Sequence, residues 1–153
     1  MNKVLLAVMI LVPALITGGC GKREVDLNEV HKIEGTLLEI TQMPQGEMTL
    51  EEFEASVSTI SVSYSGLAYI PNPIFSDGME MKDEDFLKVY NFCKDAYEKG
   101  TYSDYKEDVC DGTTYTFTYY DENGTAHVLY SGYIYNNKKL NDIIDTIAYY
   151  QVD

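Results

Sequence analysis

TTYTFTYYDENGTAHVLYSGYIY, residues 113–135, contains the clearest structural pattern in the chain. Two runs rich in tyrosine, threonine and other strand-forming residues flank Asn123-Gly124, a dipeptide typical of the two-residue type I′ turn of a β-hairpin. A turn at this place predicts three pairs on the packed face of the hairpin: Tyr119 with Val128, Phe117 with Tyr130, and Tyr115 with Gly132. The opposite face is rich in threonine, and we expect it to be hydrated.

The rest of the chain predicts two more strands and two helices. Apolar and polar side chains alternate over 33–42 and over about 56–65, as is typical of strands with one buried face. Apolar residues recur with helical spacing over 83–99 and over 137–150, and Asp83 is a candidate cap of the first of these helices.

Residues 49–56 are compatible with two structures. Thr49 and Glu52 have the spacing of a capping box, which favours a helical turn. Phe53, Ala55 and Val57 also alternate with polar residues, which favours an extension of the following strand. The sequence leaves both alternatives open.

Together these elements predict a small two-layer α+β domain, in which an antiparallel sheet carries two helices packed on one face. The chain has 153 residues, which is enough for one domain to bury a hydrophobic core without staples. We predict that this single domain covers residues 31–153.

An apolar run, VLLAVMILVPALITGGC, covers Val4–Cys20 and follows Lys3. Its length and its small final residues are typical of a secretory signal rather than a membrane span. Thr17-Gly18-Gly19-Cys20 resembles the lipobox of bacterial lipoproteins. The resemblance implies a signal peptide over 1–19, lipidation of Cys20, and a tether over 20–30. An ordinary signal peptide cleaved nearby and an uncleaved anchor are the alternatives.

The chain is strongly acidic. It has 25 aspartates and glutamates against 11 lysines and arginines, and its formal net charge is −14. Phosphates and anionic lipid headgroups would repel such a protein, so we expect no nucleic-acid partner. The charge either serves to keep the surface hydrated or suits a basic protein partner or a cation.

Candidate catalytic residues are few. The chain has two histidines, His31 and His127, and neither lies in a sequence context typical of an activated nucleophile. We therefore expect that the protein is not an enzyme and uses no cofactor. A hydrolase that works with paired carboxylates is the alternative, and it requires a cleft lined by acids with displaced pKa values.

The densest acidic patch outside the predicted helices does not predict a metal site. Its members are Asp104, Glu107, Asp108 and Asp111. Calcium loops combine oxygen ligands with a central glycine at fixed spacing, and this patch lacks that spacing. We expect no bound metal.

Cys93 and Cys110 are the cysteines that remain beyond Cys20. In an exported protein two such residues can form a disulfide, and we predict this bond. Two separate thiols, with Cys93 buried on its helix, are the alternative.

A proline-containing loop between the second strand and the first long helix is a possible interaction surface. Its apolar members are Tyr69, Ile70, Pro71, Pro73, Ile74 and Phe75. Exposed apolar groups gathered in one loop are typical of a recognition site, although the loop could also fold back over the core.

The sequence therefore favours a membrane-anchored, extracytoplasmic lipoprotein that acts as a non-enzymatic binding domain. An inhibitor or protective protein that binds a basic extracellular hydrolase is one alternative. A carboxylate-based hydrolase is the other.

Overall fold

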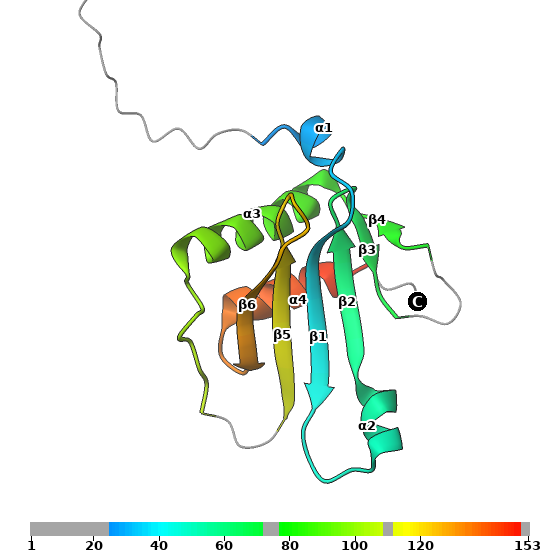
Figure 1. Ribbon diagram of the computed structural model, residues 1–153, viewed down its shortest axis with the longest axis vertical. Coiled ribbons are helices and arrows are strands. Elements are labelled where there is room, and N and C mark those ends of the chain that lie inside the picture. Colours follow the sequence, from blue (N-terminus) through cyan, green and yellow to red (C-terminus); the bar gives the residue numbers. More distant parts are fainter. Residues whose placement is uncertain (1–24, 72–76, 109–111, 151–153) are drawn as a thin grey trace, which may run out of the picture.

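A computed structural model describes residues 25–71, 77–108 and 112–150 of the chain. The described residues form a six-stranded antiparallel sheet together with helices (Figure 1). In chain order the elements are α1 (Leu27–Val30), β1 (Thr36–Pro44), α2 (Leu50–Ser56), β2 (Ser58–Ser63), β3 (Leu67–Tyr69), β4 (Met79–Glu80), α3 (Asp83–Lys99), β5 (Thr113–Tyr120), β6 (Ala126–Tyr133) and α4 (Lys138–Ala148).

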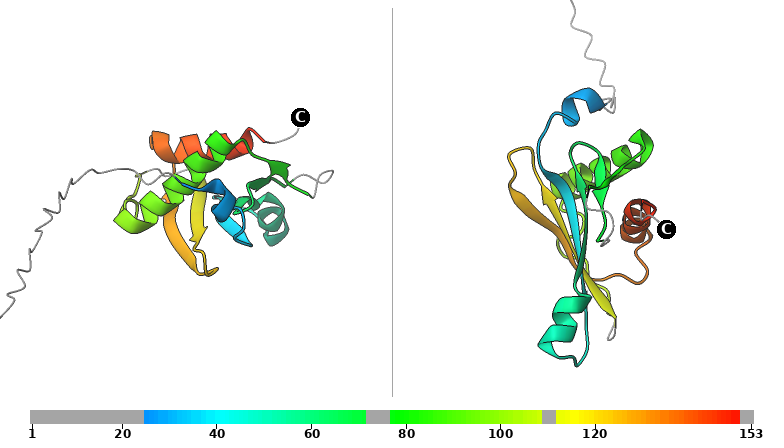
Figure 2. Two further views of the ribbon diagram at one scale, coloured as in Figure 1. Left: turned by 90° about the horizontal axis from the view of Figure 1, so that it is seen from above. Right: turned by 90° about the vertical axis from the view of Figure 1, so that its right-hand side faces the viewer.

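The strand order in the sheet is β4-β3-β2-β1-β5-β6, and each neighbouring pair is antiparallel. Helices α3 and α4 contact each other and pack on the same face of the sheet (Figure 2). The predicted α+β class, with two helices on one face of an antiparallel sheet, is confirmed. On the other face, threonines 114, 116 and 118 of β5 are partly exposed.

The core lies between the helices and the sheet because each element has one apolar face. Its largest completely buried side chains include Tyr64, Phe86, Phe117, Tyr119, Tyr130, Leu140, Ile143 and Ile147. The hydroxyl of Tyr64 donates to the carbonyl oxygen of Tyr120 at 2.7 Å, so this buried ring keeps a partner for its polar end.

Helix α3 occupies the predicted residues, but its N-terminal cap differs from the prediction. Asp83 is the first helical residue, and Lys82 at the cap position makes no side-chain capping hydrogen bond. Asp83, Glu84 and Asp85 lie in the first turn, where negative charge suits the helix dipole. Gly100 ends the helix with a φ of 58°, a conformation that glycine adopts without strain.

The ambiguous segment before β2 is helical. In α2 the Thr49 side chain accepts the backbone N–H of Glu52, and the Glu52 carboxylate accepts the backbone N–H of Thr49 at 2.8 Å. This capping box ends the ambiguity in favour of the helix. No residue of α2 is buried, and the helix projects from the end of the β1–β2 hairpin (Figure 1).

Two β-bulges each bury a pair of consecutive apolar residues. The register of β1 against β2 shifts between Thr36 and Leu38, and the extra residue is Leu37. The register of β6 against β5 shifts in the same way at Leu129. A bulge allows neighbouring side chains to point to the same face. Leu37 and Leu38 are therefore both completely buried, although alternation predicted opposite faces for them.

The hairpin turn differs from the predicted type I′ turn. Asp121 N–H donates to the Thr125 carbonyl at 3.0 Å, and Gly124 N–H donates to the Asp121 carbonyl at 2.8 Å. Gly124 has a positive φ, but Asn123 does not. The loop is therefore a three-residue turn with glycine in the left-handed conformation.

The longer loop shifts the register next to the turn by one residue. Val128 lies opposite Thr118, so the predicted pair with Tyr119 is wrong. The bulge at Leu129 then restores the predicted register. The predicted pairs of Phe117 with Tyr130 and of Tyr115 with Gly132 are confirmed.

The folded domain begins before the predicted boundary at residue 31. Residues 25–30 were expected to belong to the tether, but Leu27–Val30 form α1. Val30 lies in the core, and Val25 and Leu27 pack against it. Burial of these apolar side chains makes the segment part of the domain.

Candidate functional site

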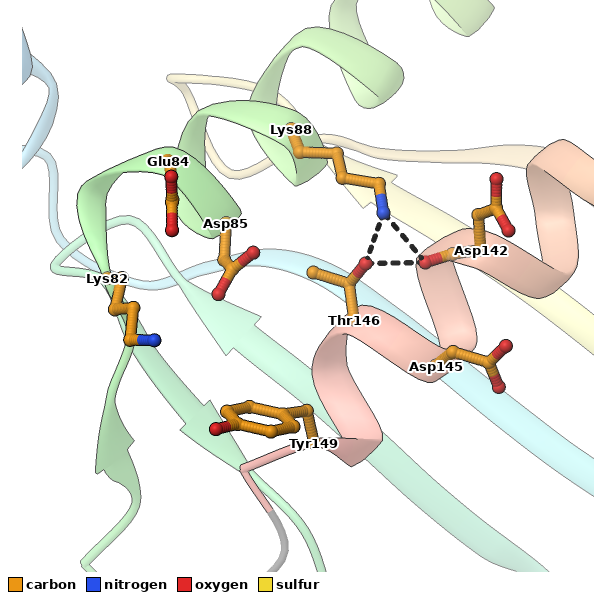
Figure 3. A pocket seen from close by; sticks show the side chains of 8 residues that line it. All are labelled: Lys82, Glu84, Asp85, Lys88, Asp142, Asp145, Thr146 and Tyr149. Atoms are coloured by element: carbon orange, nitrogen blue, oxygen red, sulfur yellow. Dashed lines mark hydrogen bonds between the residues drawn. The ribbon is translucent and has the colours of Figure 1, made fainter.

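A groove between the two long helices is lined by described residues alone. Its larger part is a pocket of about 380 Å³ between the first half of α3 and the second half of α4 (Figure 3). A smaller pocket of about 240 Å³ continues along the same helices and shares Lys88 and Asp142 with the first. The lining of the larger pocket is Lys82, Glu84, Asp85, Lys88, Asp142, Asp145, Thr146 and Tyr149.

Lys88 joins the two helices across the groove. Its ammonium donates to the Thr146 hydroxyl at 2.6 Å and to the Asp142 carbonyl at 3.3 Å, and Figure 3 shows it pointing from α3 toward α4. The Thr146 hydroxyl in turn donates to the same carbonyl. Thr146 is a buried polar residue of the core side, and these bonds satisfy its hydroxyl.

Tyr150 closes one end of the groove. Its hydroxyl donates to the Asp85 carboxylate at 2.6 Å and accepts the Lys82 backbone N–H at 2.9 Å. Burial, followed by the bond to Asp85, raises the pKa of Tyr150. The Lys82 ammonium lies 5.7 Å from the centre of the Tyr149 ring. The end of α4 is thereby fixed to the start of α3.

The carboxyl groups of the described residues do not favour acid catalysis. Those whose pKa departs from the ordinary value all have it lowered: Glu52, Glu107, Asp121 and Asp142. In the groove, the ammonium of Lys138, 2.7 Å away, lowers the pKa of Asp142. A general acid at neutral pH needs a raised pKa.

Glu107, a member of the predicted acidic patch, is a structural residue. Its carboxylate accepts the backbone N–H groups of Tyr135, Asn136 and Asn137 at 2.8, 2.9 and 3.1 Å, and the hydroxyl of Tyr105 at 2.8 Å. Burial raises the pKa of Glu107, but these hydrogen bonds outweigh it and lower the pKa below the ordinary value. The carboxylate thus fixes the segment that leads into α4.

The other members of the acidic patch are only partly described by the structure. Asp104 and Asp108 are exposed, and Asp111 lies outside the described residues. In the part of the chain that the structure describes, no group of three or more potential metal ligands gathers.

The two histidines have structural contacts. His127 lies on β6 near the hairpin loop, opposite Tyr119. Its Nε2 lies 3.1 Å from the Asp121 carboxylate, and its ring lies 4.4 Å from the Tyr97 ring, centre to centre. The bond to His127 is the main cause that lowers the pKa of Asp121 to about 2. His31 contacts the Phe86 ring edge-on at 4.8 Å.

The cysteine predictions involve residues outside the described ranges. Cys93 is a free and completely buried cysteine on α3, and burial raises the pKa of its thiol. Cys110 and Cys20 lie outside the described residues. The disulfide and the lipidation therefore stay predictions.

The described part of the predicted interaction loop is only partly exposed. The Tyr69 side chain is 37% exposed, Pro71 is exposed, and Ile70 packs against the core. Pro73, Ile74 and Phe75 lie outside the described residues. Whether the whole loop forms one surface stays a prediction.

One half of the domain carries no basic side chain. Residues 33–81 contain no lysine, arginine or histidine, and they form β1 to β4 and α2. Within this half, Leu50 is 73% exposed and Met48 is 36% exposed, next to the glutamates of α2. The end of the molecule at α2 is therefore both acidic and partly apolar (Figure 1).

Comparisons with known proteins give no relative. No protein-family model, no curated protein and no solved structure matches the chain significantly. Among the described residues, no helix has both the length and the apolar character needed to cross a bilayer.

The sequence alone did not predict the groove or the role of Glu107. Lys88 and Thr146 lie far apart in the chain, and the partners of Glu107 are backbone N–H groups. The apolar spacing of the two helices predicted that both lie on the sheet, but it did not predict which polar side chains meet between them.

Proposed function

We propose that the chain is a lipid-anchored protein on the extracytoplasmic face of a bacterial membrane, and that its domain acts by binding rather than by catalysis. The anchor is supported by the resemblance of residues 17–20 to a lipobox. Two acyl chains at one cysteine would hold a soluble domain stably at a bilayer.

The position of the domain relative to Cys20 supports a short anchor. Packing of Val25 against the core marks the start of the fold. An extended chain from residue 20 to residue 25 spans at most about 18 Å. An anchored domain would therefore sit close to the bilayer with α1 near it, and α2, at the opposite end, would project away (Figure 1).

The observation that carries the binding function is the absence of basic side chains from residues 33–81. A segment whose charged side chains are all acidic attracts a basic partner and speeds its association. The end at α2, with Leu50 and Met48 exposed, adds apolar area to that charge. A surface of this kind suits recognition of a protein.

Fatty-acid labelling in a bacterial host tests the anchor. Cells that express the full chain are given an alkyne-tagged palmitate, and Cys20→Ala is compared with Cys110→Ala as the matched control. We expect label and membrane association in the parent and in the control, and the loss of both in Cys20→Ala. Label that persists in Cys20→Ala would refute the anchor.

An inhibitor of a basic extracellular hydrolase is the second candidate, and the acidic half of the domain favours it. The chain from Gly21 keeps every described contact and is the form to test. We expect it to bind lysozyme, used as a basic hydrolase, more tightly than cytochrome c, used as a basic protein without hydrolase activity, and to release it as salt rises. Equal or absent binding at low salt would eliminate this candidate.

A further inference from the structure

The sheet ends in two very different edge strands. On one side the edge is β4, which has two residues, Met79 and Glu80. On the other side the edge is β6, which has eight residues over Ala126–Tyr133. In the described sheet the backbone of β6 pairs with β5 only. An edge strand presents its outward N–H and C=O groups to any other strand that can reach it.

The ladder indicates which residues of β6 direct their backbone groups outward. Asp121 N–H bonds the Thr125 carbonyl, so these two form a hydrogen-bonded pair. Hydrogen-bonded and non-hydrogen-bonded pairs alternate in an antiparallel ladder. His127 therefore faces β5 through its backbone, whereas Ala126 and Val128 direct their N–H and C=O groups to the free edge.

The side chains of β6 do little to protect this edge. Natural edge strands are commonly protected by charged residues, by proline or by bulges. Residues 126–135 contain no lysine, arginine, aspartate, glutamate or proline, in a chain of which 24% is charged. The one protective feature in β6 is the bulge at Leu129. Val128, next to it, is 65% exposed.

In the described residues, the segment that follows α3 makes no backbone hydrogen bond to this edge. Tyr102 and Tyr105 pack their rings on the ring of Tyr130, 6.4 and 5.8 Å away between centres. Glu107 then binds N–H groups that follow the strand. These contacts are made by side chains, and they lie at Tyr130 and after the end of the strand rather than at residues 126–128.

The charges around the edge define the occupant. Asp104 and Asp108 are exposed on the neighbouring segment together with Lys106, and Glu122 is exposed at the hairpin loop, where it also pairs with Lys94 at 3.3 Å. A second copy of the chain would bring two net charges of −14 together, which opposes self-pairing. A basic strand gains both backbone hydrogen bonds and electrostatic attraction.

We infer that β6 is a site of strand addition, and that it takes an extended segment of a partner protein rich in lysine or arginine. This inference goes beyond the proposed function, because β6 lies outside residues 33–81. Backbone pairing would supply the affinity, and the surrounding acids would supply the preference for basic segments.

The test uses the chain from Gly21 and an eight-residue peptide of alternating valine and lysine. One control peptide has glutamate in place of lysine, and another carries the same side chains but has alternate backbone nitrogens methylated, which prevents strand pairing. Residue-resolved amide hydrogen exchange locates the binding. Val128→Pro removes an outward N–H without removing a bond to β5, and Val128→Thr is its matched control.

We expect the valine–lysine peptide to slow exchange at Ala126 and Val128. Val128→Pro should weaken binding about tenfold, the value of one hydrogen bond, and backbone methylation should abolish it, whereas Val128→Thr should bind like the parent. The circular dichroism of each variant shows that it is folded. Binding that is insensitive to methylation, protection located at residues 33–81 instead, or a dimer protected at β6 in the free protein would each overturn the inference. Because the tested chain lacks residues 1–20, these results do not depend on the lipid anchor.

Discussion

Replacing Glu107 should destabilise the domain more than the replacement of most carboxylates in loops. Its side chain accepts three successive backbone N–H groups at the entry to α4 and the hydroxyl of Tyr105. Glu107→Ala leaves these donors without their acceptor, and water can replace it only in part because the site is half-buried. Glu107→Gln keeps one acceptor oxygen but loses the charge.

The hydrogen-bond geometry gives the size of the effect. A hydrogen bond to a charged group contributes about 1.5–3 kcal/mol, and a lost helix cap costs about 1 kcal/mol. Since water replaces part of the loss, we expect Glu107→Ala to lower the free energy of unfolding by about 2–3 kcal/mol and Glu107→Gln by about 1 kcal/mol. A domain of this size is stabilised by only about 5–15 kcal/mol in total.

Urea unfolding of the chain from Gly21 measures this loss, with Asp108→Asn as the matched control on the same segment. The pKa of Glu107 is lowered in the folded state, so its contribution is present above its ordinary value of 4.5 and is lost as the pH falls through the folded value. Glu107→Gln should therefore flatten the loss of stability below that pH. If Glu107→Ala is no less stable than Asp108→Asn, the assigned role of this carboxylate is wrong.

Three further predictions concern other parts of the domain. The pKa of Asp121 is lowered from 3.8 to about 2, chiefly by His127. The parent should therefore lose stability as the pH falls from 3.8 to about 2, and acid unfolding of Asp121→Asn should lack this loss. In the reduced protein, the buried thiol of Cys93 should react with a thiol reagent at least about 100-fold more slowly in the folded than in the unfolded state, whereas equal rates would contradict its burial. Ile147→Ala should cost about 2–5 kcal/mol in thermal or urea unfolding, because this side chain is completely buried, and a loss below about 1 kcal/mol would contradict its place in the core.

Local patterns predicted most of the elements. Helix α3 has its predicted bounds of 83–99 because apolar spacing and a terminal glycine are both local signals. Helix α4 covers Lys138–Ala148, within the predicted range 137–150, and Asn137 accepts the backbone N–H of Leu140 at 3.1 Å as its N-cap. The hairpin was predicted because alternation on both sides of Asn123-Gly124 is also local.

The departures from prediction come from tertiary packing. Alternation assigned Leu37 to the hydrated face, but the apolar core is more favourable for leucine, and the bulge makes its burial possible. The turn is one residue longer than predicted, and the bulge at Leu129 adds one residue to β6. The two differences compensate, so the predicted register is correct beyond the bulge. Neither the burial of Leu37 nor the altered register of the hairpin can be predicted from local sequence patterns.

The site was less predictable than the fold. The contact of Lys88 with Thr146 and the bonds of Glu107 join residues from distant parts of the chain. Single-sequence patterns indicate which faces are buried, but they do not indicate which polar side chains meet. The sequence also did not predict that β6 is an edge strand, because this follows from the strand order of the whole sheet.

Intact-mass spectrometry of the protein extracted from the membranes of a bacterial host tests the central claim most directly. The account predicts a mass equal to residues 20–153 with a diacylglyceryl group on the sulfur of Cys20, with or without a further acyl chain on its amino group. A full-length chain that keeps residues 1–19 and a free thiol at Cys20 would contradict it.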